Sequence, residues 1–281
     1  MIGLGTKGDV RVGVIQMNST SDVEDNLKRA ENLIMEAAGK GARVVGLPEN
    51  FAFMGPDEDR TQYSQDLSGS IVRFLKRVAR EGSVILLGGS FLERSAEHHG
   101  KSFNTSVLVN PKGEIAGIYR KVHLFDVDLP GGPVYKESAY IEPGREMSVC
   151  EVEGIWFGLT ICYDLRFPEL FRHLAMKGAK IIFVPSAFTL LTGKDHWFPL
   201  LQARAIENQV YILAPAQYGT HGASRHTYGH AAIVDPWGTV LAQAPDRECV
   251  VCADYLPGYQ EEVRRRIPVF SHLRTDLYPV A

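Results

Sequence analysis

Three apolar runs in this chain each end on a chemically reactive residue, and they constrain the fold more than any other feature. They begin near residues 44, 114 and 155 and end on Glu49, Lys121 and Cys162. Short continuous apolar runs are typical of buried strands. A thiol at the tip of such a strand, where a polar turn leads into a helix, is well placed to react as a nucleophile. We therefore expect a sheet protein whose strand ends carry its reactive groups.

Strand and helix patterns alternate along the rest of the chain, with turn sequences that mark hairpins. A capping box from Ser21 to Glu24 opens the first helix. The sequence predicts helices over residues 21–39, 70–80, 168–177 and 195–208, and strands over residues 11–16, 42–47, 83–90, 103–109, 114–122, 147–152, 155–162, 180–184, 210–214, 231–234, 239–242 and 249–254.

One α/β domain with both hairpin and crossover connections fits this order of elements. The chain has 281 residues, of which 45% are hydrophobic and 22% charged, so it can bury a large core. No linker rich in serine or glycine, no shift in composition and no internal repeat divides the sequence.

The charge pattern argues against nucleic-acid and membrane partners. The net charge is -3, and acidic and basic residues are mixed along the chain. No apolar stretch approaches the roughly 20 residues of a membrane span. Residues 1–8 lack the long apolar region and the cleavage site of a secretory signal. We therefore expect a soluble, cytoplasmic protein.

The other three cysteines indicate packing rather than chemistry. Cys249 and Cys252 form a Cys-x-x-Cys pattern, which occurs in redox and zinc sites, but the pair lies inside an expected buried strand. No second ligand pair with zinc spacing is present, and the nine histidines show no paired ligand spacing. We expect Cys150, Cys249 and Cys252 to be small core residues, and we expect no metal and no cofactor.

Residues 123–147 form an unusually long segment without clear periodicity. The segment follows Lys121 directly and contains Pro130–Gly–Gly–Pro133 and Glu137. A loop of this length beside a reactive group is typical of the wall of an active site.

Glu49, Lys121 and Cys162 together could carry out acyl transfer. A thiol is mostly protonated near neutral pH, so Cys162 needs a base, and Glu49 could accept its proton. Lys121 could hold the oxyanion of a tetrahedral intermediate, with the backbone N–H of Tyr163 as a second donor. The residues alone leave other readings open: a core cysteine, a solvated lysine at a strand end and a glutamate that caps a turn. Nothing in the periodicity brings positions 49, 121 and 162 together.

The motifs around these residues resemble the nitrilase, or carbon–nitrogen hydrolase, superfamily. The resemblance rests on residues 47–50, 119–125, 137–138, 160–170, 185–188, 202–208 and 235–238. It implies an α-β-β-α sandwich and a catalytic triad of Glu49, Lys121 and Cys162, with Glu137 as an additional active-site glutamate. It also implies subunits that form a homodimer or a higher homo-oligomer through their helical faces.

This resemblance divides the chain into three parts. Residues 1–9 are an N-terminal extension, and residues 10–255 are the carbon–nitrogen hydrolase domain. Residues 256–281 form a C-terminal helix and tail, which we expect at a subunit interface.

Finer motifs resemble the branch of the superfamily that acts on amides of α-keto acids. They are residues 123–128, 130–133, 192–193, 196–197 and 228–230, together with the segment from Ala216 to Arg225. The last segment is more similar to deaminated glutathione amidases than to ω-amidases. The resemblance therefore implies an amidase that hydrolyses deaminated glutathione, through a cysteine thioester, to 2-oxoglutarate and cysteinylglycine.

A keto-acid substrate needs a cation for its carboxylate, and Arg166 could bind one with two hydrogen bonds. The related amidases imply Phe188 and Thr192 as its neighbours in substrate binding. An ion pair between Arg166 and Glu169 at the start of a helix is the alternative. The loop of residues 218–226 could contact the cysteinylglycine half of the substrate, and Trp237 is expected to pack within its hairpin turn.

Other functions stay open. The chain could be an ω-amidase that acts on 2-oxoglutaramate, an N-carbamoyl amidohydrolase or a nitrilase. A non-catalytic binding protein is disfavoured, because every position of the triad is occupied.

Overall fold

Two β-sheets packed face to face form the centre of the protein, which was analysed as a computed structural model describing residues 8–95, 100–128, 134–222 and 225–278. The Pro130–Gly–Gly–Pro133 motif and most of the predicted N-terminal extension lie outside these residues. In the described part of the chain, one sheet has nine strands and the other has six.

The nine-stranded sheet is built around strand β1, which pairs in parallel with β2 and β13. Its strands lie in the order β14-β13-β1-β2-β3-β5-β4, with β17 beside β1 and β6 beside β5. They are β1 (Val10–Met17), β2 (Val44–Gly46), β3 (Ile85–Leu87), β4 (Phe91–Arg94), β5 (Ser102–Val109), β6 (Ile115–Arg120), β13 (Ala216–His221), β14 (Arg225–Tyr228) and β17 (Cys249–Tyr255).

The six-stranded sheet has three parallel strands, β10, β11 and β12, at its centre. Its order is β16-β15-β12-β11-β10-β9. The strands are β9 (Ser148–Val152), β10 (Ile155–Leu159), β11 (Ile181–Phe183), β12 (Tyr211–Ala214), β15 (Ala232–Val234) and β16 (Val240–Gln243). A separate short hairpin joins β7 (Asp126–Asp128) and β8 (Val134–Lys136).

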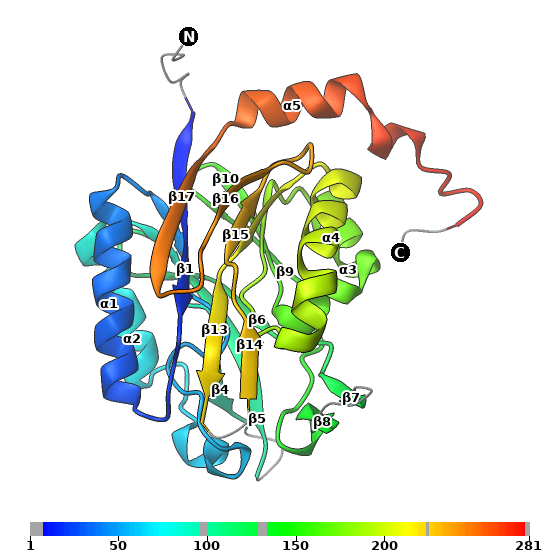
Figure 1. Cartoon of the computed structure of the whole chain (residues 1–281). Helices are drawn as coiled ribbons and strands as arrows, with labels where there is room; N and C mark the ends of the chain where they lie inside the picture. Colours follow the sequence, from blue (N-terminus) through cyan, green and yellow to red (C-terminus); the bar gives the residue numbers. More distant parts are fainter. Residues whose placement is uncertain (1–7, 96–99, 129–133, 223–224, 279–281) are drawn as a thin grey trace.

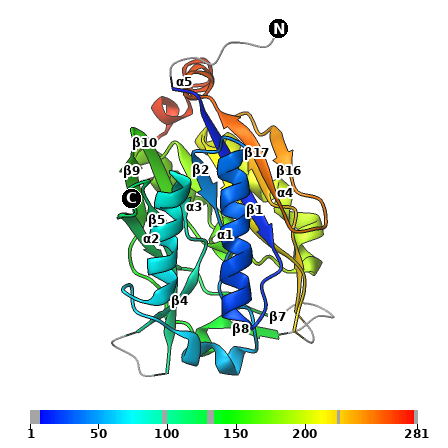
Figure 2. The ribbon, with the colours of Figure 1, turned by 90° about the vertical axis from the view of Figure 1, so that its left-hand side faces the viewer.

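Helices cover both outer faces, so the molecule is a four-layer α-β-β-α sandwich (Figure 1). Helices α1 (Val23–Gly39) and α2 (Ser70–Gly82) cover the nine-stranded sheet, as Figure 2 shows from that side. Helices α3 (Pro168–Met176) and α4 (Leu190–Asn208) cover the six-stranded sheet. Residues from the inner faces of both sheets, such as Val14 and Phe157, share one buried core. The predicted fold class is confirmed.

Helix α5 (Pro257–Arg266) crosses one end of the sandwich, whereas the β7–β8 and β13–β14 hairpins lie at the opposite end (Figure 1). Gln260 links helix α5 to the rest of the same subunit, because its Nε2 donates hydrogen bonds to the carbonyl oxygens of Lys180 and Gln209 at 2.9 and 3.0 Å. None of the helices in the described ranges combines the length and apolar character that a membrane span needs.

The predicted helices and strands form, and the differences concern their ends and several strands that were not predicted. Asp22 rather than Ser21 caps α1, since the Asp22 side chain accepts a hydrogen bond from the N–H of Asp25. Helix α4 begins at Leu190, not at residue 195, and continues through Pro199. Five strands were missed: β4, the pair β7 and β8, and the pair β13 and β14. They have three to six residues, and runs this short carry little periodicity.

The predictions for the remaining cysteines and for Trp237 were partly wrong. Cys150, Cys249 and Cys252 are half-buried rather than core residues. Cys150 lies on β9, and Cys249 and Cys252 lie on β17, which pairs with β1. Trp237 is 55% exposed, so it packs less in its hairpin turn than expected.

Candidate active site

Three reactive side chains meet where strand ends from the two sheets come together. Glu49 follows β2 and Lys121 follows β6, both in the nine-stranded sheet, whereas Cys162 follows β10 in the other sheet. Each side chain is buried. The turn after β2 packs against Gly89, where a Cβ atom would collide with the carbonyl oxygen of Pro48. A glycine is therefore needed at position 89 to let the turn before Glu49 close.

Lys121 lies between two carboxylates. Its Nζ donates to Oε1 of Glu49 at 3.0 Å and to both carboxylate oxygens of Glu137 at 3.0 and 2.9 Å. Only 2% of the Lys121 residue is exposed. Burial alone would lower the pKa of this ammonium group, but the charges of Glu137 and Glu49 outweigh it and raise the pKa well above the ordinary value. Lys121 is therefore a fixed buried cation.

The Glu49 carboxylate receives hydrogen bonds on both oxygens. Oε1 also accepts from Asn104 Nδ2 at 2.9 Å, and Oε2 accepts from the backbone N–H of Ala187 at 2.8 Å. The Cys162 thiol lies near enough to Glu49 for each group to affect the pKa of the other. Burial opposes ionisation of Glu49, but the Lys121 charge and these hydrogen bonds together lower its pKa below the ordinary value. Glu49 is thus an ionised base beside a thiol.

The thiol of Cys162 is protonated in this arrangement. Burial and the neighbouring Glu49 charge raise its pKa well above the ordinary value, although Lys121 acts in the opposite direction. The backbone of Cys162 is left-handed, with φ of 49°, and its N–H donates to the carbonyl oxygen of Pro185 at 3.0 Å. A left-handed conformation is disfavoured for a residue with a side chain, so the surrounding structure must hold it.

Asp164 joins the turn of Cys162 to the strand that carries Lys121. This carboxylate is fully buried and accepts hydrogen bonds from the N–H of Ile161 and the hydroxyl of Tyr119, both at 2.8 Å. Nδ1 of His123 lies 2.7 Å from its other oxygen. We did not predict a role for Asp164. Its position two residues after the nucleophile, within the turn Cys162–Arg166, was the available signal.

A cavity opens in front of these groups, with about 540 Å³ of empty space that is partly open to solvent. Of the predicted site residues, its described lining includes Glu49, Lys121, Glu137, Cys162, Tyr163, Phe188 and Thr192. The lining also includes Phe125, Tyr135 and Tyr140 from the segment 123–147, which was expected to form a wall of the site, and Arg225 from the loop 218–226, which was expected to contact the substrate. The lining residues outside any segment or residue that was predicted for the site are Asn50, Arg60, Ala187 and Thr189. The structure therefore brings together residues from both sheets and from both hairpins at this end of the sandwich.

Arg166 is the exception among the predicted site residues, since it is not part of the described lining. Its guanidinium carbon lies 5.1 Å from the ring centre of Phe188 and 6.0 Å from that of Tyr163, two residues that do line the cavity. Its Nη1 lies 3.3 Å from Nδ1 of His196 rather than against Glu169. Substrate binding by Arg166 stays a prediction.

Two other arginines line the cavity: Arg60, for which the sequence offered little signal, and Arg225, which belongs to the loop expected to contact the substrate. Arg60 lies in a short 3-10 helix, Asp57–Tyr63, with its guanidinium 5.0 Å from the ring centre of Tyr140. Arg225 begins β14 and lies 5.8 Å from the ring centre of Tyr135. No group of three or more His, Cys, Asp or Glu side chains in the described ranges is arranged to hold a metal ion.

Comparison with known proteins shows that most of the chain matches one protein family. Residues 11–265 match the carbon–nitrogen hydrolase family. A deaminated glutathione amidase from Synechocystis is 44% identical over 260 residues, which cover 92% of this chain and 96% of the relative. An omega-amidase from Homo sapiens is 39% identical over 270 residues, with 96% and 97% covered.

Solved structures agree. The C. elegans NitFhit protein superposes with a TM-score of 0.92 at 37% identity, over 99% of this chain and 68% of that one. Saccharomyces cerevisiae Nit3, a member of branch 10 of the nitrilase superfamily, gives a TM-score of 0.86 at 32% identity, over 96% and 100% of the two chains.

Proposed function

Because this chain belongs to the carbon–nitrogen hydrolase family and is an amidase, we propose that it hydrolyses deaminated glutathione to 2-oxoglutarate and cysteinylglycine. The observation that carries the proposed chemistry is that Cys162 and Glu49 line the same cavity, with Lys121 bound between Glu49 and Glu137. This arrangement provides a nucleophile, a base and a fixed positive charge at one cavity.

In the first half of the reaction, Glu49 accepts the thiol proton while Sγ of Cys162 attacks the amide carbonyl. Lys121 and the N–H of Tyr163 stabilise the oxyanion of the tetrahedral intermediate. Glu49 then returns its proton to the departing nitrogen, the C–N bond breaks, and the acyl group stays on sulfur as a thioester.

In the second half, a water molecule takes the place of the amine. Glu49 removes its proton as it attacks the thioester, and the sulfur leaves and recovers that proton. Glu137 keeps Lys121 protonated and in place throughout, because two of the hydrogen bonds of the ammonium group go to this carboxylate. The carboxylate product and the free thiol restore the starting state.

The cations of the cavity suit the proposed substrate. Deaminated glutathione carries two carboxylates, one on the keto acid and one on the glycine. Arg60 and Arg225 come from different elements of the lining, and a guanidinium can bind a carboxylate with two hydrogen bonds. The smaller 2-oxoglutaramate has only the keto-acid carboxylate. In an enzyme for deaminated glutathione, each of the two arginines could therefore bind one of the two carboxylates of the substrate.

The test compares kcat/KM for deaminated glutathione and for 2-oxoglutaramate. We expect a preference of at least about tenfold for deaminated glutathione, which corresponds to about 1.4 kcal/mol from the additional carboxylate contact. A reversed preference would support ω-amidase instead. Carbon dioxide release or nitrile hydrolysis would indicate an N-carbamoyl amidohydrolase or a nitrilase.

Arginine variants test the binding mode with the same two substrates. Arg60→Met, Arg225→Met and Arg166→Met should each be measured on both. The variant that loses activity only on deaminated glutathione identifies the partner of the glycine carboxylate, whereas a loss on both identifies the partner of the keto-acid carboxylate. If none of the three changes kcat/KM, recognition by arginine is wrong.

We also propose that the protein forms a homodimer or a higher homo-oligomer in the cytoplasm. Apolar side chains are exposed on the outer helices, among them Met176 on α3 and Leu190, Leu191 and Ile206 on α4. The segment after residue 256 would add to the same interface. Light scattering of the purified protein tests the oligomeric state, and a monomer at micromolar concentration would contradict it.

A further inference from the structure

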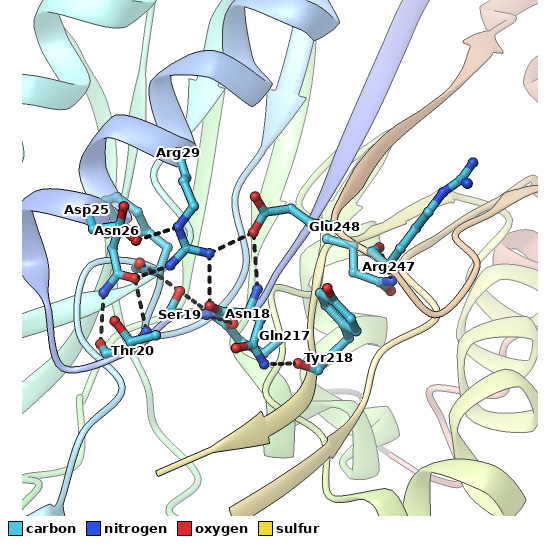
Figure 3. A network of polar contacts seen from close by, with 12 residues as sticks. Asn18, Ser19, Thr20, Asp25, Asn26, Arg29, Gln217, Tyr218, Arg247 and Glu248 are labelled. Atoms are coloured by element: carbon cyan, nitrogen blue, oxygen red, sulfur yellow. Dashed lines mark hydrogen bonds and ion pairs between the residues drawn. The ribbon is translucent and has the colours of Figure 1, made fainter.

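Gln217 on β13 is fully buried and joins two segments that are far apart in the sequence. Its Nε2 donates to the hydroxyl of Ser19 at 2.7 Å and to the backbone carbonyl oxygen of Glu49 at 3.0 Å. Its Oε1 accepts from the N–H of Ser19 at 2.9 Å (Figure 3). Both ends of this amide are therefore used, one as donor and one as acceptor.

The contacts of Gln217 and Ser19 hold the main chain around the base. The Ser19 hydroxyl donates to the carbonyl oxygen of Phe51 at 2.8 Å, so the carbonyls on both sides of Asn50 are bound by this pair. Asn50 has a left-handed backbone, with φ of 55°. Because that conformation is disfavoured, the turn that carries Glu49 depends on such outside contacts to keep its shape.

Gln217 also holds the segment that binds the Glu49 carboxylate. The backbone N–H of Gln217 donates to the carbonyl oxygen of Ser186 at 2.8 Å. Ala187, which follows Ser186, donates its own N–H to Oε2 of Glu49 at 2.8 Å. One residue thus fixes both the main chain of Glu49 and a hydrogen-bond donor to its side chain.

A polar network keeps Ser19 itself in place. Nη1 of Arg29 donates to the carbonyl oxygen of Asn18 at 3.0 Å and to Glu248 at 2.9 Å, while Nδ2 of Asn18 donates to the carbonyl oxygen of Tyr218 at 2.6 Å (Figure 3). The loop between β1 and α1 is thereby tied to the residue that follows Gln217. A change at Gln217 cannot be absorbed by a free shift of this loop.

We propose that Gln217 is a positioning residue that sets the orientation of the Glu49 carboxylate toward the Cys162 thiol. The inference rests on the proposed role of Glu49 as the base. Only an amide side chain of this length supplies an acceptor for the N–H of Ser19 together with a donor for the carbonyl of Glu49. Glutamate would present an acceptor in place of that donor, and methionine would lose both bonds.

The test compares Gln217→Met with Gln260→Met as a matched control. Gln260 is also fully buried, and its Nε2 also donates two hydrogen bonds, in this case both to carbonyl oxygens, but it lies in α5 at the far end of the molecule. We expect Gln217→Met to lower kcat about 10- to 100-fold with little change in KM, since a small displacement of a catalytic group costs about this much. Gln260→Met should lower the melting temperature but leave kcat unchanged.

The pH profile separates positioning from general destabilisation. Gln217→Met keeps the backbone hydrogen bond to Ser186, but a shift of the Glu49 main chain would move Oε2 away from the N–H of Ala187. Loss of that hydrogen bond would raise the pKa of Glu49, so the acidic limb of kcat/KM should move to higher pH in Gln217→Met and stay in place in Gln260→Met. An unchanged kcat and an unchanged limb in Gln217→Met would overturn the proposal, as would equal losses of kcat in both variants. If Gln217→Met does not fold, Ser19→Ala should show the same changes to a smaller extent, and normal values there would overturn it too.

Alkylation of Cys162 by iodoacetamide distinguishes this inference from the proposed function. If Glu49→Gln leaves the pH dependence of alkylation unchanged, Glu49 is not the base and the proposed mechanism fails. If Glu49→Gln changes it but Gln217→Met does not, only the positioning role of Gln217 fails. The rate of alkylation requires no substrate, so it does not depend on which amide the enzyme hydrolyses.

Discussion

At the scale of single residues, Cys162 and Glu49 form a neutral thiol beside a carboxylate rather than a preformed thiolate. Burial and the charge of Glu49 keep the proton on sulfur, as the raised pKa of Cys162 indicates. The base must therefore remove this proton as the sulfur attacks. The left-handed backbone of Cys162 belongs to the same arrangement, since it turns the chain sharply at the end of β10.

Replacing the sulfur tests this chemistry directly. Cys162→Ala should reduce amine release to the background rate, because no other group in the proposed mechanism can form the thioester. Alanine has the same left-handed strain, so the melting temperature should change by only a few degrees. Amine release and a thermal melt of the same preparation check both expectations, and substantial turnover by a folded variant would refute the mechanism.

The pH dependence of catalysis reports on Glu49. Its pKa is lowered from 4.5, so Glu49 stays ionised as the pH falls through the range in which an ordinary glutamate takes up a proton. We expect kcat/KM to stay flat from pH 7 down to below about pH 4.5, provided that the protein remains folded. A pH-rate profile with circular dichroism at each pH measures this. An acidic limb near pH 6 would show that Glu49 is not stabilised as described.

At the scale of elements, the short β13–β14 hairpin supplies several residues that build or support the active site. It brings Gln217 to the turn of Glu49 and Arg225 to the cavity, and His221 ties it to the loop after β1. The ring of His221 is buried, with Nδ1 2.8 Å from the carbonyl oxygen of Ser19 and Nε2 2.8 Å from the hydroxyl of Thr227. These contacts make the hairpin sensitive to acid.

Burial lowers the pKa of His221 from 6.5 to about 4. Between these two values the unfolded chain binds this proton and the folded chain does not, so stability is lost as the pH falls from about 6.5 to about 4. His221→Gln should remove up to about 1.4 kcal/mol per pH unit from this slope. Urea unfolding at several pH values measures it. His226→Gln, on the exposed part of the same hairpin, is the control, and equal slopes in both variants would contradict the prediction.

At the scale of the whole molecule, the active site depends on how the two sheets are held against each other. Tyr119 on β6 belongs to one sheet, and Asp164 follows β10 of the other. Their buried hydrogen bond of 2.8 Å joins the strand of Lys121 to the turn of Cys162. Its loss should therefore affect both stability and catalysis.

Tyr119→Phe leaves the buried Asp164 without one of its donors, which should reduce the free energy of unfolding by about 1–3 kcal/mol. We also expect a lower kcat, because the turn of Cys162 can then shift relative to Lys121. Tyr255→Phe is the control, since the Tyr255 hydroxyl is buried and donates to Gln260 away from the cavity. A stability loss in both variants without a difference in kcat would show that the Tyr119 contact has no role in placing the nucleophile.

The main strands, the hairpins around residues 110–113 and 235–238, and the positions of Glu49, Lys121 and Cys162 at strand ends could all be predicted from the residues alone. These features are local, because apolar periodicity and turn residues act over a few neighbours. The resemblance of the motifs to the family added the prediction of the four-layer fold and of Glu137 as an active-site residue.

The set of side chains that share the cavity depends on how distant parts of the chain pack together. Arg60 and Arg225 come from short elements without periodicity, and Arg166, although it follows the nucleophile closely, lies outside the described lining. The hydrogen bonds of Gln217 and Asp164 join segments tens to hundreds of residues apart. Periodicity sets which face of an element is buried, but the packing of one sheet on the other sets the distances between their ends.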